Sequence, residues 1–224
     1  MSETSDDYRS KLAPQPLEMA RGIRFPRDDE YRWGQDVERA SVAQANLTTG
    51  YLMRATVGDS FSAFFEVNVH ASAMWACFCD LVVALLPEVA APLVQFKDAE
   101  PRYGTYAARA DGLAVFRPHA LFLPHEGYLG FGMMFQYRGN TEEVFVHPAK
   151  YLQVWTNKPD QARAVFARHG LPEVPDLRFI NEYPMVTEAL ADAEGSSIYP
   201  QVLRSIEAAF EQLVPIFPPE AEAP

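Results

Sequence analysis

Histidine and glutamate side chains are the residues of this sequence with the types needed for acid–base or metal chemistry. His119, His125 and His147 lie in one stretch of the chain, and Glu126 directly follows His125. If neighbouring strands bring these imidazoles together, with Glu126 or Glu143 as the carboxylate, they would form an acid–base or metal site. No local spacing enforces this arrangement, and ordinary core or surface histidines are the competing interpretation. We therefore keep four catalytic candidates and predict no metal site: His119, His125, Glu126 and His147.

The segment FLPHEGYLGFG at residues 122–132 contains the histidine–glutamate pair and three glycines. A glycine-rich loop that binds phosphate requires a strand-to-helix context, which this segment lacks. We interpret Gly127, Gly130 and Gly132 as positions of turn geometry and close backbone packing. The pair itself would be catalytic only if the imidazole reaches a second polar group in a pocket.

Common catalytic signatures are absent from the sequence. It has no GxxxxGK[ST] loop, no GxGxxG loop that opens a helix, no GxSxG elbow and no HExxH motif. Each of these motifs meets a physical requirement for binding phosphate, presenting a nucleophile or holding a metal. We therefore predict no cofactor, and the absences favour a non-enzymatic function.

Acidic residues outnumber basic ones by 30 to 19, which gives a formal net charge of −11 and a pI of about 4.9. Nucleic-acid binding requires a dense basic surface, so this charge argues against it. The acids concentrate in residues 171–224, which hold ten of them and two arginines. Such a surface would attract a basic partner, although a solvated face that maintains solubility is the simpler interpretation.

Aromatic residues in polar stretches can also contribute to a contact, and Trp33 is the tryptophan in such a stretch. The candidate partner-binding residues are Trp33, Glu188, Asp192, Glu194, Glu207 and Glu211.

The N-terminal residues carry no basic segment followed by an apolar one, so the sequence predicts no secretion signal and a cytoplasmic location. Residues 70–87 are apolar on nearly every side but include Asp80. We expect them to form the most buried helix of the core and not a membrane span. Cys77 and Cys79 lie in this helix, and we interpret them as unpaired core thiols.

Hydrophobic periodicity and turn residues predict the secondary structure. Strands are predicted at residues 51–57, 61–69, 93–98, 102–109, 113–118, 130–138, 143–156 and 177–184. Helices are predicted at residues 34–47, 70–87 and 157–170 and from residue 200 onward. The helix at 157–170 is the best specified, because Asn157 can cap its start and Gly170 can end it.

The order of these elements predicts an α+β fold, with a mostly antiparallel sheet and helices packed on one face. The order also admits two strand-strand-helix units, although no residue-level repeat supports them. We expect an irregular N-terminal arm at residues 1–30, a single α+β domain at 31–215 and a mobile acidic tail at 216–224.

Two hypotheses from different functional classes follow. The first is a non-enzymatic intracellular protein-binding domain, of which an inhibitor or immunity-type protein that neutralises a basic partner is a concrete version. The alternative is a small hydrolase or isomerase with a histidine/glutamate pocket, which requires those side chains to meet in a concave site. The sequence predicts neither a nucleic acid nor a membrane as partner, and it leaves homo-oligomerisation open.

Overall fold

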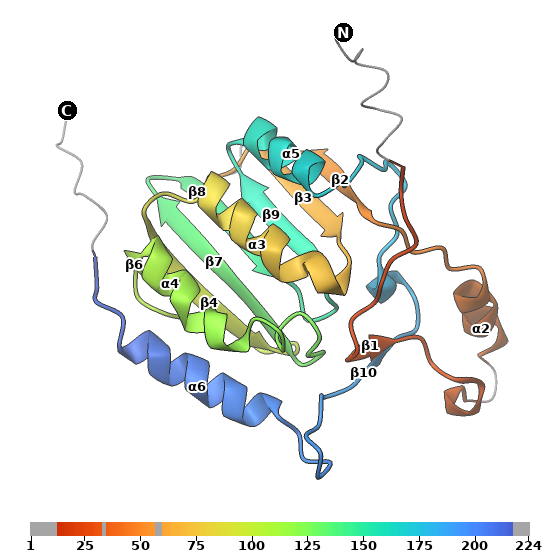
Figure 1. Ribbon diagram of the computed structural model, residues 1–224. Coiled ribbons are helices and arrows are strands. Elements are labelled where there is room, and N and C mark those ends of the chain that lie inside the picture. Colours follow the sequence, from red (N-terminus) through yellow and green to blue (C-terminus); the bar gives the residue numbers. More distant parts are fainter. Residues whose placement is uncertain (1–12, 33–34, 57–59, 217–224) are drawn as a thin grey trace, which may run out of the picture.

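The computed structural model describes residues 13–32, 35–56 and 60–216 (Figure 1). Within these residues, eight strands form one sheet in the order β2-β3-β9-β8-β7-β4-β5, with β6 paired to β4, and every pairing is antiparallel. The strands are β2 (Gly50–Ala55), β3 (Ala63–Asn68), β4 (Val89–Phe96), β5 (Arg102–Tyr103), β6 (Ala107–Ala108), β7 (Leu129–Tyr137), β8 (Asn140–Val146) and β9 (Leu152–Thr156).

Helices pack on one face of this sheet (Figure 1). Helix α3 lies against β8 with α5 beside it, whereas α4 and α6 cover β4. The predicted α+β fold is confirmed, and the chain order contains two strand-strand-helix runs, β2–β3–α3 and β8–β9–α5. The helices are α2 (Asp36–Ala43), α3 (Ala71–Leu85), α4 (Arg109–Phe116), α5 (Pro159–Arg168) and α6 (Tyr199–Glu211), with the 3-10 turns η1 (Asp28–Glu30), η2 (Arg117–His119) and η3 (Ile180–Glu182).

The main hydrophobic core lies between this helical layer and the sheet. Alternate side chains of a strand point to opposite faces, so Phe65 and Val67 of β3 enter this core and are fully buried. Helix α3 contributes Phe78 and Leu81, which are also fully buried, and the ring of Phe78 packs edge-on against Phe131 of β7. This packing fixes which face of each strand is left for solvent.

A second, smaller core joins the N-terminal residues to one end of the sheet. Ile23 packs there with Tyr151 and Phe179, and β1 (Ile23–Arg24) pairs with β10 (Val186–Thr187) in a separate two-stranded ribbon. A Cβ atom on Gly127 would lie 2.3 Å from the carbonyl oxygen of Gly22. Gly127 is therefore a position of close backbone packing, as its sequence context predicts.

The strands predicted at 102–109 and 113–118 are wrong in their greater part. Only the short strands β5 and β6 form in the first range, and helix α4 occupies most of the second. Gly112 suggests a turn in the sequence, but it lies inside α4, where a Cβ atom would come within 2.5 Å of Cε of Met133. The close approach of α4 to β7 explains this glycine.

The strand predicted at 177–184 is also wrong, because this segment is irregular and contains η3. Its apolar side chains Leu177, Phe179 and Ile180 are buried in the second core. A loop that packs one side against a core produces a short apolar run that resembles the pattern of a strand.

Candidate protein-binding surface

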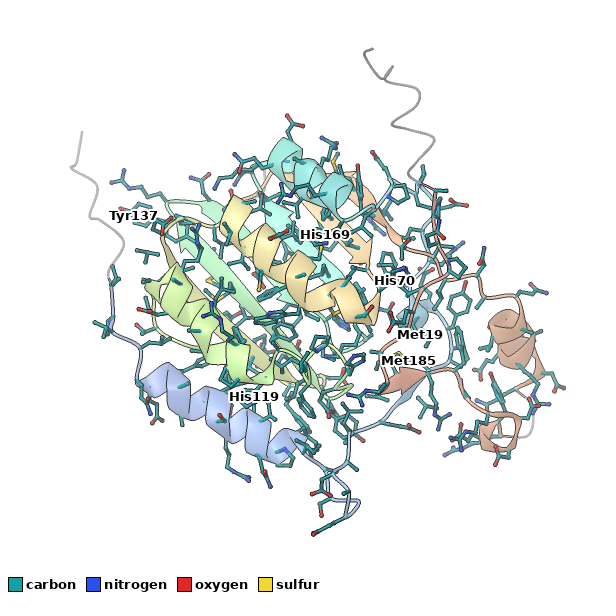
Figure 2. All side chains as sticks on the ribbon, viewed as in Figure 1. Met19, His70, His119, Tyr137, His169 and Met185 are labelled. Carbon is teal, nitrogen blue, oxygen red and sulfur yellow. The ribbon has the colours of Figure 1, made fainter. Side chains whose placement is uncertain are left out.

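The three candidate histidines do not share one site. His119 lies beside α6, where its Nε2 atom is 3.1 Å from the hydroxyl oxygen of Ser205 (Figure 2). His125 and His147 lie near a different residue, Lys150. Burial is the main cause of the lowered pKa of both imidazoles, which reaches about 4 for His147, and the charge of Lys150 adds to it. The two imidazoles have separate partners: Nδ1 of His125 accepts from the N–H of Arg21 at 3.4 Å, and Nδ1 of His147 accepts from the N–H of Ala149 at 3.0 Å.

Lys150 is the buried group in this cluster, and sequence reasoning missed it. The residue is 5% exposed, and its Nζ atom donates hydrogen bonds to the carbonyl oxygens of Leu123 at 2.8 Å and Leu129 at 2.6 Å. Burial lowers the pKa of Lys150 to about 7, against an opposing effect of Glu126. Its position as a lysine within the apolar run around Pro148 is the sequence signal that could have revealed it.

Glu126 is fully buried, and both of its carboxylate oxygens accept hydrogen bonds from the backbone. Oε1 accepts from the N–H of Tyr128 at 3.0 Å, and Oε2 accepts from the N–H of Leu190 at 2.9 Å. These bonds connect a tight turn to the segment that precedes α6. They give Glu126 a structural role that does not require a substrate.

The space beside this cluster is too small for a substrate. A cavity of about 10 Å³ is lined in part by Lys150, Ala149 and Asn68, which leaves room for about one water molecule. His119, His125 and His147 line neither this cavity nor three larger clefts on the described part of the chain. The geometry therefore offers the histidine/glutamate hypothesis no substrate-sized pocket among these clefts.

Two of the predicted partner-binding acids are already paired within the chain. Glu188 accepts hydrogen bonds from the guanidinium of Arg24, including one from Nε at 2.9 Å. Glu207 on α6 forms an ion pair with Arg102 on β5. Their negative charges are therefore partly neutralised, which weakens the acidic surface predicted for this third of the chain.

The remaining predicted partner-binding residues are dispersed. The Oδ1 atom of Asp192 accepts hydrogen bonds from the N–H groups of Glu194 and Ser196, both at 2.9 Å, and so orders its own loop. Glu194 lies exposed in that loop, whereas Glu211 is exposed at the end of α6. Trp33 lies outside the described residues. These acids therefore do not form one compact site.

The face of the sheet opposite the helices carries a row of large apolar side chains. Phe64 on β3 pairs with Trp155 on β9, Trp155 pairs with Glu143 on β8, and Glu143 pairs with Met134 on β7. The rings of Phe64 and Trp155 are 5.0 Å apart at an interplanar angle of 30°. All four residues remain partly exposed. Among the described residues, neither hydrophobic core includes Phe64, Trp155 or Met134.

Phe145, which lies on the same face of β8 as Glu143, is 5% exposed and packs across β7. If Gly130 had a Cβ atom, that atom would lie 2.7 Å from Cζ of Phe145. A Cβ atom on Gly132 would lie 3.0 Å from Cδ2 of the same ring. The ring therefore lies over the two glycines, which confirms their predicted role in close packing. Leu93 of β4 lies opposite Gly132 on the far side. We call the partly exposed surface the platform and define it as Phe64, Met134, Glu143 and Trp155. Phe145 and Leu93, which are 5% and 1% exposed, pack beneath it.

Glu143 is the ionisable member of the platform. Burial raises the pKa of Glu143 to about 7. The hydrogen bonds and ion pairs among the described residues do not include its carboxyl group, so nothing there offsets the cost of ionisation. The sequence suggests Glu143 only as a partner for the histidines, because it does not reveal which face of β8 the helices leave open. Perturbed ionisable groups of this kind are enriched at functional sites.

A cleft of about 680 Å³ between α2 and residues 181–186 is a second candidate. Three glutamates line it, Glu30, Glu38 and Glu182, and the described residues of the lining include no lysine or arginine. However, α2 has no buried residue, so this wall of the cleft is held by few contacts. The platform lies on central strands of the sheet, and a site on rigid elements is better defined. We therefore regard the platform as the stronger candidate.

Three further features bear on function: metal sites, membrane-spanning helices and similarity to known proteins. Among the described residues, no group of three histidine, cysteine, aspartate or glutamate side chains is placed to hold a metal ion. No helix in the described part of the chain has the length and apolar character to cross a membrane. Comparison of the chain with protein-family models, with curated proteins and with solved structures finds no match.

Proposed function

We propose that this chain is a non-enzymatic protein-binding domain that uses the platform to bind a basic protein, as an inhibitor or immunity-type protein would. The observation that carries the proposal is the row of large apolar side chains on the sheet face that the helices leave open. The solvent face of an antiparallel sheet is commonly polar. A contiguous apolar patch on such a face is typical of a protein–protein contact.

Charge supports a basic partner over a second copy of this chain. The net charge of −11 repels another copy and attracts a cationic protein. The platform itself contains Glu143, which has no cation among the described residues. We extend the proposal to a cytoplasmic location, because Cys77 and Cys79 are both unpaired thiols.

The enzymatic alternative has less structural support. It requires His125 or His147 to face a substrate, whereas the described cavity beside their neighbour Lys150 measures about 10 Å³. An enzyme of this kind would need a rearrangement that opens the cluster.

A capture experiment tests the proposal. The immobilised protein is exposed to native lysate at low salt, retained proteins are eluted with a salt gradient, and each is identified by mass spectrometry. We expect a basic protein that elutes with increasing salt, because salt screens attraction between exposed charges. The captured protein is then purified and titrated against wild type and variants by calorimetry.

Two variants make this titration specific to the platform. Trp155→Gln should weaken binding by at least about tenfold, because a buried aromatic at the centre of a contact is a typical hot spot. Leu121→Gln replaces an apolar residue that is 89% exposed outside the platform and should leave affinity unchanged. Equal affinity of wild type and Trp155→Gln, or the lack of any salt-sensitive basic partner, would overturn the proposal.

A further inference from the structure

Glu143 is an acid in an apolar setting, and no cation pairs with it in the part of the chain that the structure describes. Its cross-strand neighbours Trp155 and Met134 are uncharged. The other acid on this face of the sheet, Glu66, has the guanidinium of Arg54 at 3.5 Å. A desolvated carboxylate is costly unless it is paired and hydrogen-bonded. A bound partner could therefore relieve this cost by placing a cation at Glu143.

The surroundings of Glu143 match a planar cation. Trp155 lies opposite Glu143, and Phe145 follows two residues later on the same face of β8. Phe145 is only 5% exposed, because its ring packs down on Gly130 and Gly132 of β7, so the partly exposed indole of Trp155 is the ring that a ligand at Glu143 can reach. A guanidinium can form two parallel hydrogen bonds to a carboxylate and can stack on aromatic rings, whereas a lysine ammonium is compact and strongly hydrated.

We infer that Glu143 and Trp155 recognise one arginine side chain of the bound protein. This inference rests on the proposed function and specifies its partner at the same surface. The guanidinium pairs with the carboxylate of Glu143, and the face of the guanidinium and the aliphatic stem of the arginine cover the indole ring of Trp155. The bound arginine thereby removes the energetic cost of ionising Glu143.

Short peptides on the full chain test this recognition directly. The probes are three capped tripeptides, Gly-X-Gly, in which X is arginine, lysine or citrulline, the uncharged analogue of arginine. Binding to the isotope-labelled protein is followed by NMR through the indole N–H of Trp155 and the side-chain carboxyl carbon of Glu143. We expect the arginine peptide to shift both signals and to bind at least about tenfold more tightly than the citrulline peptide, with the lysine peptide in between.

Two isosteric variants separate the local ion pair from overall charge. Glu143→Gln should reduce affinity for the arginine peptide by about tenfold. Asp111→Asn removes the same charge from an exposed position on α4 and should leave affinity nearly unchanged. Equal losses in the two variants would overturn the inference, and so would equal binding of the arginine and citrulline peptides or the lack of any shift at Trp155.

The dependence on pH provides a second readout. Burial raises the pKa of Glu143 to about 7, so the free carboxyl group is largely protonated at pH 6 and ionised at pH 8. Tyr103 on β5 is the neighbouring titratable group that senses Glu143, and burial also raises its pKa above the ordinary value of 10.0. Affinity for the arginine peptide should therefore increase from pH 6 to pH 8 in wild type and not in Glu143→Gln.

Failure of this inference can be distinguished from failure of the proposed function. If a captured basic protein depends on Trp155 but the arginine peptide does not bind, the proposed function stands and arginine recognition is wrong. If the peptide binds through Glu143 but no basic protein is captured, arginine recognition stands and the proposed function is wrong.

Discussion

At the scale of single residues, Glu143 links stability to the platform. The folded chain raises the pKa of this carboxyl group from 4.5 to about 7, so between these pH values the folded state holds a proton that the unfolded state has released. Stability contributed by Glu143 therefore falls as pH rises through this window and stays lower above it. We expect Glu143→Gln to increase the free energy of unfolding at pH 8 by about 1 to 2 kcal/mol and to change it little at pH 4.5.

Urea denaturation of both proteins at the two pH values checks this expectation. Asp111→Asn, which changes the same charge on exposed α4, should show no such difference between the two pH values. A Glu143→Gln variant that is less stable than wild type at pH 8 would mean that the carboxylate has a stabilising partner. In that case Glu143 would not be available to a bound arginine.

At the scale of elements, the sequence predicts what local signals determine. Gly170 has a φ of 68° and ends α5 as predicted. The capping role predicted for Asn157 is wrong, because the N-cap residue of α5 is Lys158 and no side chain caps it, while the side chain of Asn157 donates to the carbonyl oxygen of Ser60. Gly112 is likewise misleading as a sign of a turn, because the lack of a side chain there allows α4 to approach Met133 of β7. Local periodicity therefore predicts most strands and helices, but not the residues whose roles depend on tertiary contacts.

The platform could not be predicted from periodicity alone. The alternation in β8 places Glu143 and Phe145 on one face and Val144 on the other. Both faces carry large apolar residues, so the sequence does not reveal which of them the helices cover. Lys150 was missed for a related reason, since its two carbonyl partners, Leu123 and Leu129, lie more than twenty residues away in the chain.

The two-stranded ribbon of β1 and β10 provides a prediction at this scale. Arg24 on β1 binds Glu188 after β10 and Glu30 in η1, with hydrogen bonds of 2.9 Å from Nε to Glu188 and 2.6 Å from Nη1 to Glu30. We expect Arg24→Ala to loosen this ribbon and to accelerate hydrogen exchange severalfold at the N–H of Glu188, which donates to the carbonyl oxygen of Gly22. Native-state exchange followed by NMR measures this rate.

Arg178→Ala is the matched control for this experiment. Arg178 pairs with Glu182 four residues later, and neither residue belongs to β1 or β10 or pairs with Arg24. The Arg178→Ala variant should leave hydrogen exchange at the N–H of Glu188 unchanged. Equal acceleration in both variants would indicate a general loss of stability, and no acceleration in Arg24→Ala would show that backbone pairing alone holds the ribbon.

At the scale of the whole molecule, Lys150 lies where the two hydrophobic cores meet. It donates to the carbonyl oxygens of Leu123 and Leu129, which belong to the main core, whereas its neighbours Ala149 and Tyr151 belong to the second core. A neutral amine has two N–H groups, which is enough for both hydrogen bonds. The uncharged form of Lys150 is therefore well suited to this junction, and its protonation is costly to the fold.

The pH dependence of stability should report this cost. Because burial lowers the pKa of Lys150 from 10.5 to about 7, the unfolded chain binds the extra proton between these values, and stability rises with pH there. The rise should be clearest from pH 7 to pH 9 and at most about 2 to 3 kcal/mol. Above about pH 9, Cys77 and Cys79 oppose this rise in stability. Burial raises their pKa values above 9.0, so the thiols ionise first in the unfolded chain.

Lys150→Met tests whether this residue is the source of the rise. The variant removes the donor to two buried carbonyl groups, so we expect it to be less stable than wild type by about 2 kcal/mol at pH 9. Its stability should not rise between pH 7 and pH 9, so the difference from wild type should shrink toward pH 7, where burying the charged lysine costs most. Urea denaturation across this range measures both effects. Parallel pH profiles for the two proteins would assign the rise to other groups and would mean that the junction between the cores tolerates a charged lysine.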